Sequence, residues 1–224
     1  MLFLMGIGPV AAWSQDADKL LQQVKNKLAL VKDYVAEGSM KTDIPFVKMA
    51  DANVVVYFRQ PDQFRVQRAN GISILPKGGV QGSLHTILSN KSFTPVAAGN
   101  TNMDGKYLAV IKLLPVDEKS EIVLITLYVD EKTALVWHTS STTRNNGTYE
   151  TKLQYGKYAS MGLPDQVQFI FNTTEFKLPK AMSVEYETGK TAKPATAAKD
   201  NKGRITISYK RYTVNKGIPN DIFK

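Results

Sequence analysis

The side chains best suited to bind a ligand lie in residues 54–67, which read VVVYFRQPDQFRVQ. Side chains alternate between the two faces of a strand with a period of two, so this stretch predicts two short strands that each carry one apolar face. The apolar faces consist of Val54, Val56 and Phe58 on the first strand and of Phe64 and Val66 on the second.

A turn that carries positive charge joins these two strands. Gln60, Pro61 and Asp62 form the turn signal, because proline presets its own backbone angle and aspartate favours turns. Arg59 and Arg65 flank the turn. An apolar face that ends in positive charge suits an apolar molecule with a polar or anionic head. It equally suits an ordinary sheet edge, and the remaining sequence has to decide between the two.

The residue types that carry catalysis form no known constellation in this sequence. The two histidines, His85 and His138, have no second ligand at metal-binding spacing, and neither HExxH nor CxxC occurs. Gly78, Gly79 and Gly82 form no phosphate-binding loop, because the full GxxxxGK[ST] pattern does not occur in the sequence, and a GxSxG elbow is also missing. We therefore expect a protein that is not an enzyme and uses no cofactor or metal. An exported enzyme that acts on envelope lipid or polysaccharide is an alternative.

Composition favours one large domain of a β-rich class. The chain has 224 residues, of which 43% are hydrophobic, and its formal net charge is +9 from 29 basic and 20 acidic side chains. The basic residues are dispersed and match no nucleic-acid-binding module, so we expect no nucleic-acid partner. The charge favours anionic lipid surfaces or acidic partners, or simply solubility.

The beginning of the chain is typical of an export signal. Residues 2–12 form an apolar segment too short to span a bilayer, and the small residues Ala12 and Ser14 occupy the positions expected before a cleavage site. We predict a signal peptide over residues 1–14 and a single domain over residues 15–224. A buried N-terminal strand is the alternative. The sequence has no cysteine for a lipid anchor, so we expect a soluble periplasmic protein.

Residues 16–34 are predicted to form an amphipathic helix. Their apolar side chains recur at helical spacing, which places them on one stripe. The stripe consists of Leu20, Leu21, Val24, Leu28 and Val31.

Most of the remaining chain alternates like β-strands, with one or two helical turns at residues 83–90. We predict strands at residues 34–42, 47–59, 64–68, 71–75, 106–114, 121–130, 134–143, 148–158, 167–172, 181–186 and 204–214, and a mobile loop at about 188–202. Residues 121–130 are the most apolar run and are assigned to a central strand with Val123, Ile125, Leu127 and Val129 on one face; Val167, Phe169 and Phe171 share a face of a later strand. One helix followed by many strands predicts a single antiparallel sheet curved strongly on itself, although a sandwich would also fit.

Three segments resemble the LolA-like family of outer-membrane lipoprotein-sorting proteins, which are lipoprotein carriers. Residues 57–65 read YFRQPDQFR, residues 127–136 read LYVDEKTALV, and residues 163–171 lead to the Leu-Pro-Lys at 178–180. Two departures accompany the resemblance. Gln60 stands where the family has a basic residue before the proline, and residues 71–75, GISIL, replace an Asp-Gly-x-x-Leu-aromatic run.

The resemblance implies an unclosed antiparallel β-barrel, or half-barrel, with a helical lid over an apolar cavity that holds the acyl chains of lipoproteins or lipids. It also implies a monomer that receives its cargo from an inner-membrane release complex and passes it to an outer-membrane acceptor. An envelope sensor or regulatory domain of the same fold is the alternative. The implied cavity residues are Val54, Val56, Phe58, Phe64, Val66, Val123, Ile125, Leu127, Phe169 and Phe171. The implied residues of the mouth and lid are Arg59, Gln60, Arg65, Leu20, Leu21, Val24 and Leu28.

Overall fold

The computed structural model describes residues 11–45, 50–68, 84–89, 93–174 and 201–223. The elements in chain order are α1 (Ala11–Ala29), β1 (Asp33–Asp43), β2 (Ala52–Arg59), β3 (Gln63–Arg68), α2 (Leu84–Ser89), β4 (Phe93–Met103), β5 (Lys106–Pro115), β6 (Ile122–Asp130), β7 (Leu135–Thr143), β8 (Thr148–Gln154), η1 (Ala159–Met161), β9 (Gln166–Asn172), β10 (Lys202–Val214) and η2 (Asn220–Phe223). The predictions for residues 1–10, 71–75 and 181–186, and for most of 188–202, lie outside the described residues.

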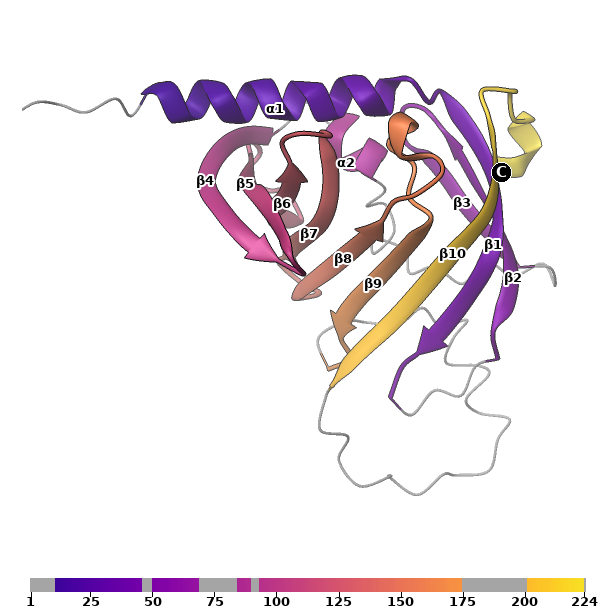
Figure 1. The fold of residues 1–224 in the computed structure, drawn as a ribbon. Coiled ribbons are helices and arrows are strands. Elements are labelled where there is room, and N and C mark those ends of the chain that lie inside the picture. The colour runs from indigo at the N-terminus through magenta and orange to yellow at the C-terminus, as the bar shows by residue number, and fades with distance from the viewer. Residues whose placement is uncertain (1–10, 46–49, 69–83, 90–92, 175–200, 224) are drawn as a thin grey trace, which may run out of the picture.

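All strands of the described residues belong to one antiparallel sheet in the order β3-β2-β1-β10-β9-β8-β7-β6-β5-β4. The sheet curves strongly, and α1 lies across one end of it (top of Figure 1). Within the described residues, the edge strands β3 and β4 do not pair with each other, so the sheet stays open. The predicted half-barrel with an N-terminal helix is therefore confirmed, and the sandwich is not formed.

Helix α1 buries the predicted apolar stripe against the sheet. Leu20, Leu21, Val24 and Leu28 are all buried, and burying each such side chain contributes about 1.5–3 kcal/mol. The predicted end of the helix at residue 34 is wrong, because α1 ends at Ala29. The side chain of Asn215 holds the segment that follows: its Oδ1 accepts from the backbone N of Lys32 at 2.7 Å and its Nδ2 donates to the carbonyl of Leu30 at 2.8 Å.

The core consists of two clusters on the concave face. One joins β1, β2, β3, β9 and β10 around Phe58 and Phe171, and the other packs α1 and α2 onto β5, β6 and β7 around Ile125 and Leu127. The two clusters lie on the same side of the sheet, because the strand register places inward-facing residues of neighbouring strands opposite each other. Leu127 on β6 pairs with Thr139 on β7, for example.

The sequence pattern missed β4. This strand, FTPVAAGNTNM, contains small and polar residues and so lacks the apolar alternation that identified the other strands. Its pairing with β5 and its packing against α1 make it a strand in the folded protein. The predicted strand at 148–158 is also shorter in the structure, because β8 ends at Gln154 and η1 follows.

Candidate ligand-binding cavity

A cavity of about 100 Å³, which we call the inner cavity, lies on the concave face. Its walls come from α1, α2, the loop around η1 and the strands β1, β3, β7, β8, β9 and β10. The lining is dominated by apolar side chains. It consists of Leu28, Tyr34, Phe64, Leu84, His85, Thr139, Thr151, Leu153, Gly162, Leu163, Pro164, Val167, Phe169, Ile205, Ile207, Tyr209 and Tyr212.

The structure separates the predicted cavity residues into those that line the inner cavity and those that fill the core. Phe64, Phe169 and Leu28 line the inner cavity. The others pack against protein side chains in the two core clusters, as ordinary core residues do. These core residues are Val54, Val56, Phe58, Val66 and Phe171 in the first cluster, and Ile125, Leu127, Leu20, Leu21 and Val24 in the second.

Val123 does not share the inner face with Ile125 and Leu127, which corrects the prediction. The side chain of Val123 is 42% exposed, whereas Ile125 and Leu127 are fully buried. The register between β6 and β7 shifts between Ile122 and Leu124, so Val123 is an extra residue in a β-bulge. Ile122 packs against the core cluster in its place.

The two arginines predicted at the mouth lie on the outer face of the sheet instead. Phe58 pairs with Phe64 on the inner face, so their neighbours Arg59 and Arg65 point away from it. Arg59 donates from Nη1 to the carbonyl of Ile218 at 2.9 Å and lies 4.8 Å from the centre of the Phe223 ring. Arg65 donates to the carbonyl of Ile222 at 2.5 Å. Both arginines thus hold the C-terminal segment that contains η2.

Gln60 ties the β2–β3 turn to the segment between α1 and β1. Its side-chain Nε2 donates to the carbonyl of Val31 at 2.9 Å, and its backbone N donates to the carbonyl of Lys32 at 2.8 Å. The turn therefore has a fixed position beside the end of α1, close to the inner cavity.

A second hollow of about 190 Å³, which we call the outer pocket, adjoins this turn. It lies between the last turns of α1, helix α2 and the β2–β3 turn. Its lining consists of Lys25, Leu28, Ala29, Gln60, Pro61, His85 and Leu88. Leu28 and His85 therefore line both hollows.

His85 is a buried histidine whose ring contacts Leu28 and Phe58. Its Nε2 lies 3.2 Å from the carbonyl oxygen of Leu28, and its ring centre lies 4.3 Å from that of Phe58. A carbonyl only accepts, so Nε2 carries the proton of the neutral ring. Burial lowers the pKa of His85 to about 4, although the hydrogen bond to Leu28 opposes the shift. His85 is therefore neutral at pH 7.

Three of the six polar side chains that line the inner cavity are tyrosines, namely Tyr34, Tyr209 and Tyr212. Tyr34, Tyr158, Tyr209 and Tyr212 form a cluster in which the ring of Tyr212 lies 5.0–5.3 Å from each of the other three. The hydroxyl of Tyr212 donates to the carbonyl of Pro164 at 2.7 Å. Burial raises the pKa of Tyr34, Tyr209 and Tyr212 well above the ordinary value, so these phenols stay protonated and uncharged.

The size of the inner cavity limits what it can hold with its walls in this position. A dry cavity of roughly 150 Å³ in another protein accommodates benzene, and the inner cavity is smaller, at about 100 Å³. It can accept a short apolar group directly. A long acyl chain fits only if side chains of α1 or α2 move.

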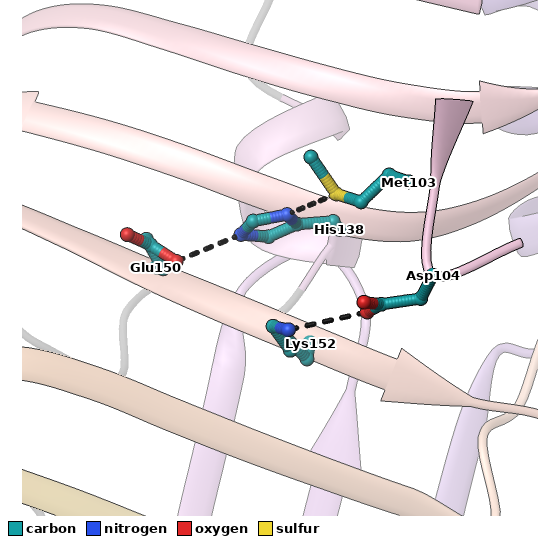
Figure 2. A network of polar contacts seen from close by, with 5 residues as sticks. All are labelled: Met103, Asp104, His138, Glu150 and Lys152. Carbon is teal, nitrogen blue, oxygen red and sulfur yellow. Dashed lines mark hydrogen bonds and ion pairs between the residues drawn. The ribbon is translucent and has the colours of Figure 1, made fainter. Parts of the chain in front are cut away.

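A polar network occupies the opposite face of the sheet, around His138 (Figure 2). His138 Nδ1 lies 2.8 Å from Met103 Sδ, and Nε2 lies 3.3 Å from Oε2 of Glu150. Lys152 forms an ion pair with Asp104 at 3.1 Å. Burial lowers the pKa of His138, whereas Glu150 raises it and Lys152 lowers it further. Met103 and Asp104 come from the β4–β5 hairpin, so the network fastens that hairpin to β7 and β8.

The described residues also bear on metal ions and membranes. They contain no group of three or more His, Cys, Asp or Glu side chains arranged to hold a metal ion. None of the helices in the part of the chain that the structure describes is both long and apolar enough to cross a bilayer.

Sequence reasoning missed several residues of the inner cavity, namely His85, Thr139, Thr151, Leu153, Tyr34, Tyr209 and Tyr212. Strand periodicity does place Tyr34, Thr151 and Tyr209 on inward faces, and that signal was present in the sequence. Periodicity cannot show which part of an inward face stays uncovered, since that depends on how the sheet curves and where the helices lie.

Comparison with solved structures shows which known proteins share this fold. No family model and no curated protein matches the sequence. Among solved structures, a domain titled as an outer membrane lipoprotein-sorting protein from Vibrio parahaemolyticus is 8% identical with a TM-score of 0.59, covering 94% of this chain and 97% of that one. A LolA superfamily protein from Nitrosomonas europaea is 12% identical with a TM-score of 0.58, covering 93% and 97%. A DUF1329 family protein from Desulfovibrio piger is 12% identical with a TM-score of 0.52, covering 96% and 97%.

These structures share the whole architecture of the chain rather than one motif, because the matched regions cover nearly all of both proteins. At such low identity the likeness concerns the fold. The chain therefore has the open half-barrel fold of LolA superfamily and lipoprotein-sorting domain structures, as the resemblance in its sequence implied.

Proposed function

We propose that this protein is a periplasmic carrier that binds an acyl chain of a lipoprotein or lipid in the inner cavity and delivers it to the outer membrane. The observation that carries the proposal is an apolar cavity beneath α1 and α2, on the concave face of an open half-barrel. The shared fold with a domain titled as a lipoprotein-sorting protein supports it.

The energetics of burying an acyl chain support a carrier of this kind. Each buried methylene contributes about 0.8 kcal/mol, so a chain of ordinary length can repay the movement of a few wall residues. In this proposal the protein acts as a monomer without a cofactor, a nucleic acid or a catalysed reaction. An inner-membrane release complex loads it, and an outer-membrane acceptor unloads it.

Native mass spectrometry of the protein purified from its own cells, followed by lipid extraction, tests the proposal. We expect co-purified lipid or acylated protein, and we expect Thr151→Phe to lose it because Thr151 lines the inner cavity. Thr148→Phe is the matched control, since Thr148 is exposed on the same strand. Circular dichroism of both variants establishes that they fold. A clean ligand-free mass for the wild-type protein, or equal loads in both variants, would contradict the proposal.

A delivery assay separates the carrier from the envelope sensor, which would bind the same chain without passing it on. Loaded protein is mixed with outer-membrane vesicles, and the acylated cargo in the vesicles is measured over time. Transfer faster than spontaneous release supports the carrier. Retention of the cargo by the protein supports the sensor.

A further inference from the structure

Among the described residues, two belong to the linings of both the inner cavity and the outer pocket. Leu28 and His85 belong to both linings, and the Nε2–H of His85 donates to the carbonyl of Leu28 across 3.2 Å. The contact joins the last turns of α1 to α2. We call this contact the partition.

We propose that the two hollows are one ligand site, that the apolar chain reaches the inner cavity through the outer pocket when the partition opens, and that Lys25 binds an anionic group next to that chain. The inference rests on the proposed function and specifies the route and the class of ligand: an amphiphile with an anionic group beside its apolar chain.

The contacts of the partition make His85 the part that moves. Among the described residues, its ring makes a hydrogen bond to the carbonyl of Leu28 and a ring contact to Phe58 at 4.3 Å. The opposite wall is held more firmly, because Gln60 is fixed by hydrogen bonds to Val31 and Lys32 at 2.9 and 2.8 Å. Rotation of the His85 side chain would connect the hollows without moving the β2–β3 turn.

The two linings suit different parts of the ligand. The inner cavity offers apolar walls with the uncharged hydroxyls of tyrosines and threonines, which suits a chain. Among the described residues that line either hollow, Lys25 is the one lysine or arginine, and it lies in the outer pocket. An anion beside Lys25 would thus remain near solvent while the chain is buried, which avoids the cost of burying a charge.

Association kinetics of two probes test the partition. The probes are palmitoyl lysophosphatidylglycerol, which is anionic, and monopalmitoylglycerol, which has a chain of the same length and no charge. We expect His85→Ala to speed the association of both by about tenfold, because one hydrogen bond and one ring contact are lost. Leu28→Ala, which shortens the other side chain of the partition, should also accelerate the association of both probes. His85→Phe keeps the ring contact but loses the hydrogen bond, so its rate should lie between those of the wild-type protein and His85→Ala.

His138→Ala is the matched control for the loss of a buried histidine, because His138 lies on the opposite face of the sheet. Unchanged association in His85→Ala and Leu28→Ala, or equal acceleration in His138→Ala, would overturn the partition.

Equilibrium affinities of the same probes test Lys25. Lys25→Gln should weaken lysophosphatidylglycerol by about fivefold, as expected for a partly exposed ion pair, and leave monopalmitoylglycerol unchanged. Lys19→Gln, at an exposed position of the same helix, should change neither. Equal effects of Lys25→Gln on both probes, or none on either, would overturn the assignment of the anion site. If the wild-type protein binds neither probe, the proposed function itself fails.

Discussion

The two histidines are buried to nearly the same extent, in different surroundings. His85 is 8% exposed and lies on the concave side between Leu28 and Phe58, whereas His138 is 7% exposed and lies on the opposite face among Met103, Glu150 and Lys152. The concave surroundings offer no charge to a protonated ring among the contacts described for His85. The opposite face offers the carboxylate of Glu150.

The difference shows that one curved sheet supports two kinds of interior. The concave interior is apolar and contains the inner cavity, so its side chains can move to admit a ligand. The interior under the β4–β5 hairpin is polar and connected by specific pairs, so its side chains hold neighbouring strands together.

The largest expected difference comes from the aromatic ring that contacts each histidine. Phe58→Ala should lower the free energy of unfolding by about 3–5 kcal/mol, because Phe58 is fully buried and its removal leaves a void. Tyr128→Ala removes the ring stacked on His138 at 5.0 Å and should cost about 1–2 kcal/mol, because Tyr128 is only half-buried. Urea denaturation measures both. Similar losses in the two variants would mean that the regions pack alike.

The second difference is the dependence of stability on pH. The pKa of His85 is lowered to about 4 in the folded protein and is about 6.5 when unfolded, so the unfolded state binds more protons between these values. Stability should therefore fall as the pH drops from about 6.5 to about 4, and His85 should account for about 3 kcal/mol of that loss.

Variants that cannot titrate isolate this contribution. Denaturation across the same pH range should give a flatter curve for His85→Leu than for the wild-type protein, and the difference between the curves removes the effect of carboxylates. The pKa of His138 is lowered as well, but Glu150 opposes the shift, so His138→Leu should flatten the curve less. A larger flattening by His138→Leu would reverse the comparison.

The smallest expected effect concerns the ion pair beside His138. Lys152 and Asp104 are 3.1 Å apart and are both substantially exposed, so Lys152→Gln should cost no more than about 0.5 kcal/mol. The loss should shrink in 1 M NaCl, where the Debye length is about 3 Å. Thermal unfolding at low and high salt measures it. A loss that persists in high salt would show that Lys152 contributes by packing instead.

Most of the fold could be predicted from the sequence because burial on one side of a strand leaves a period of two. That pattern identified β3, β6 and β9 closely, whereas β2 was predicted over residues 47–59 and begins only at Ala52. It failed for β4, whose residues carry little apolar contrast and whose state is decided by pairing with β5. It also misplaced Val123, since a bulge changes the face of a side chain without any change in composition.

The candidate site was predicted less well, for a geometric reason. Phe64 and Phe169 were found because they lie on apolar faces, but the same reasoning included Phe58 and Phe171, which are covered by other side chains. Arg59 and Arg65 were assigned to the mouth from their nearness to the turn in the sequence. Their odd positions relative to Phe58 and Phe64 send them to the other face, where the C-terminal segment covers them.

The pairing of β1 with β10 also affects how the chain folds. Tyr34 and Val214 are partners in the register although they lie near opposite ends of the described chain. The three strands β1, β2 and β3 therefore cannot join the rest of the sheet until β10 has been synthesised. Pairing between distant segments slows folding. A ribosome-bound chain that lacks its last strand would have an incomplete sheet, so the whole domain should become protected against proteases in one late step.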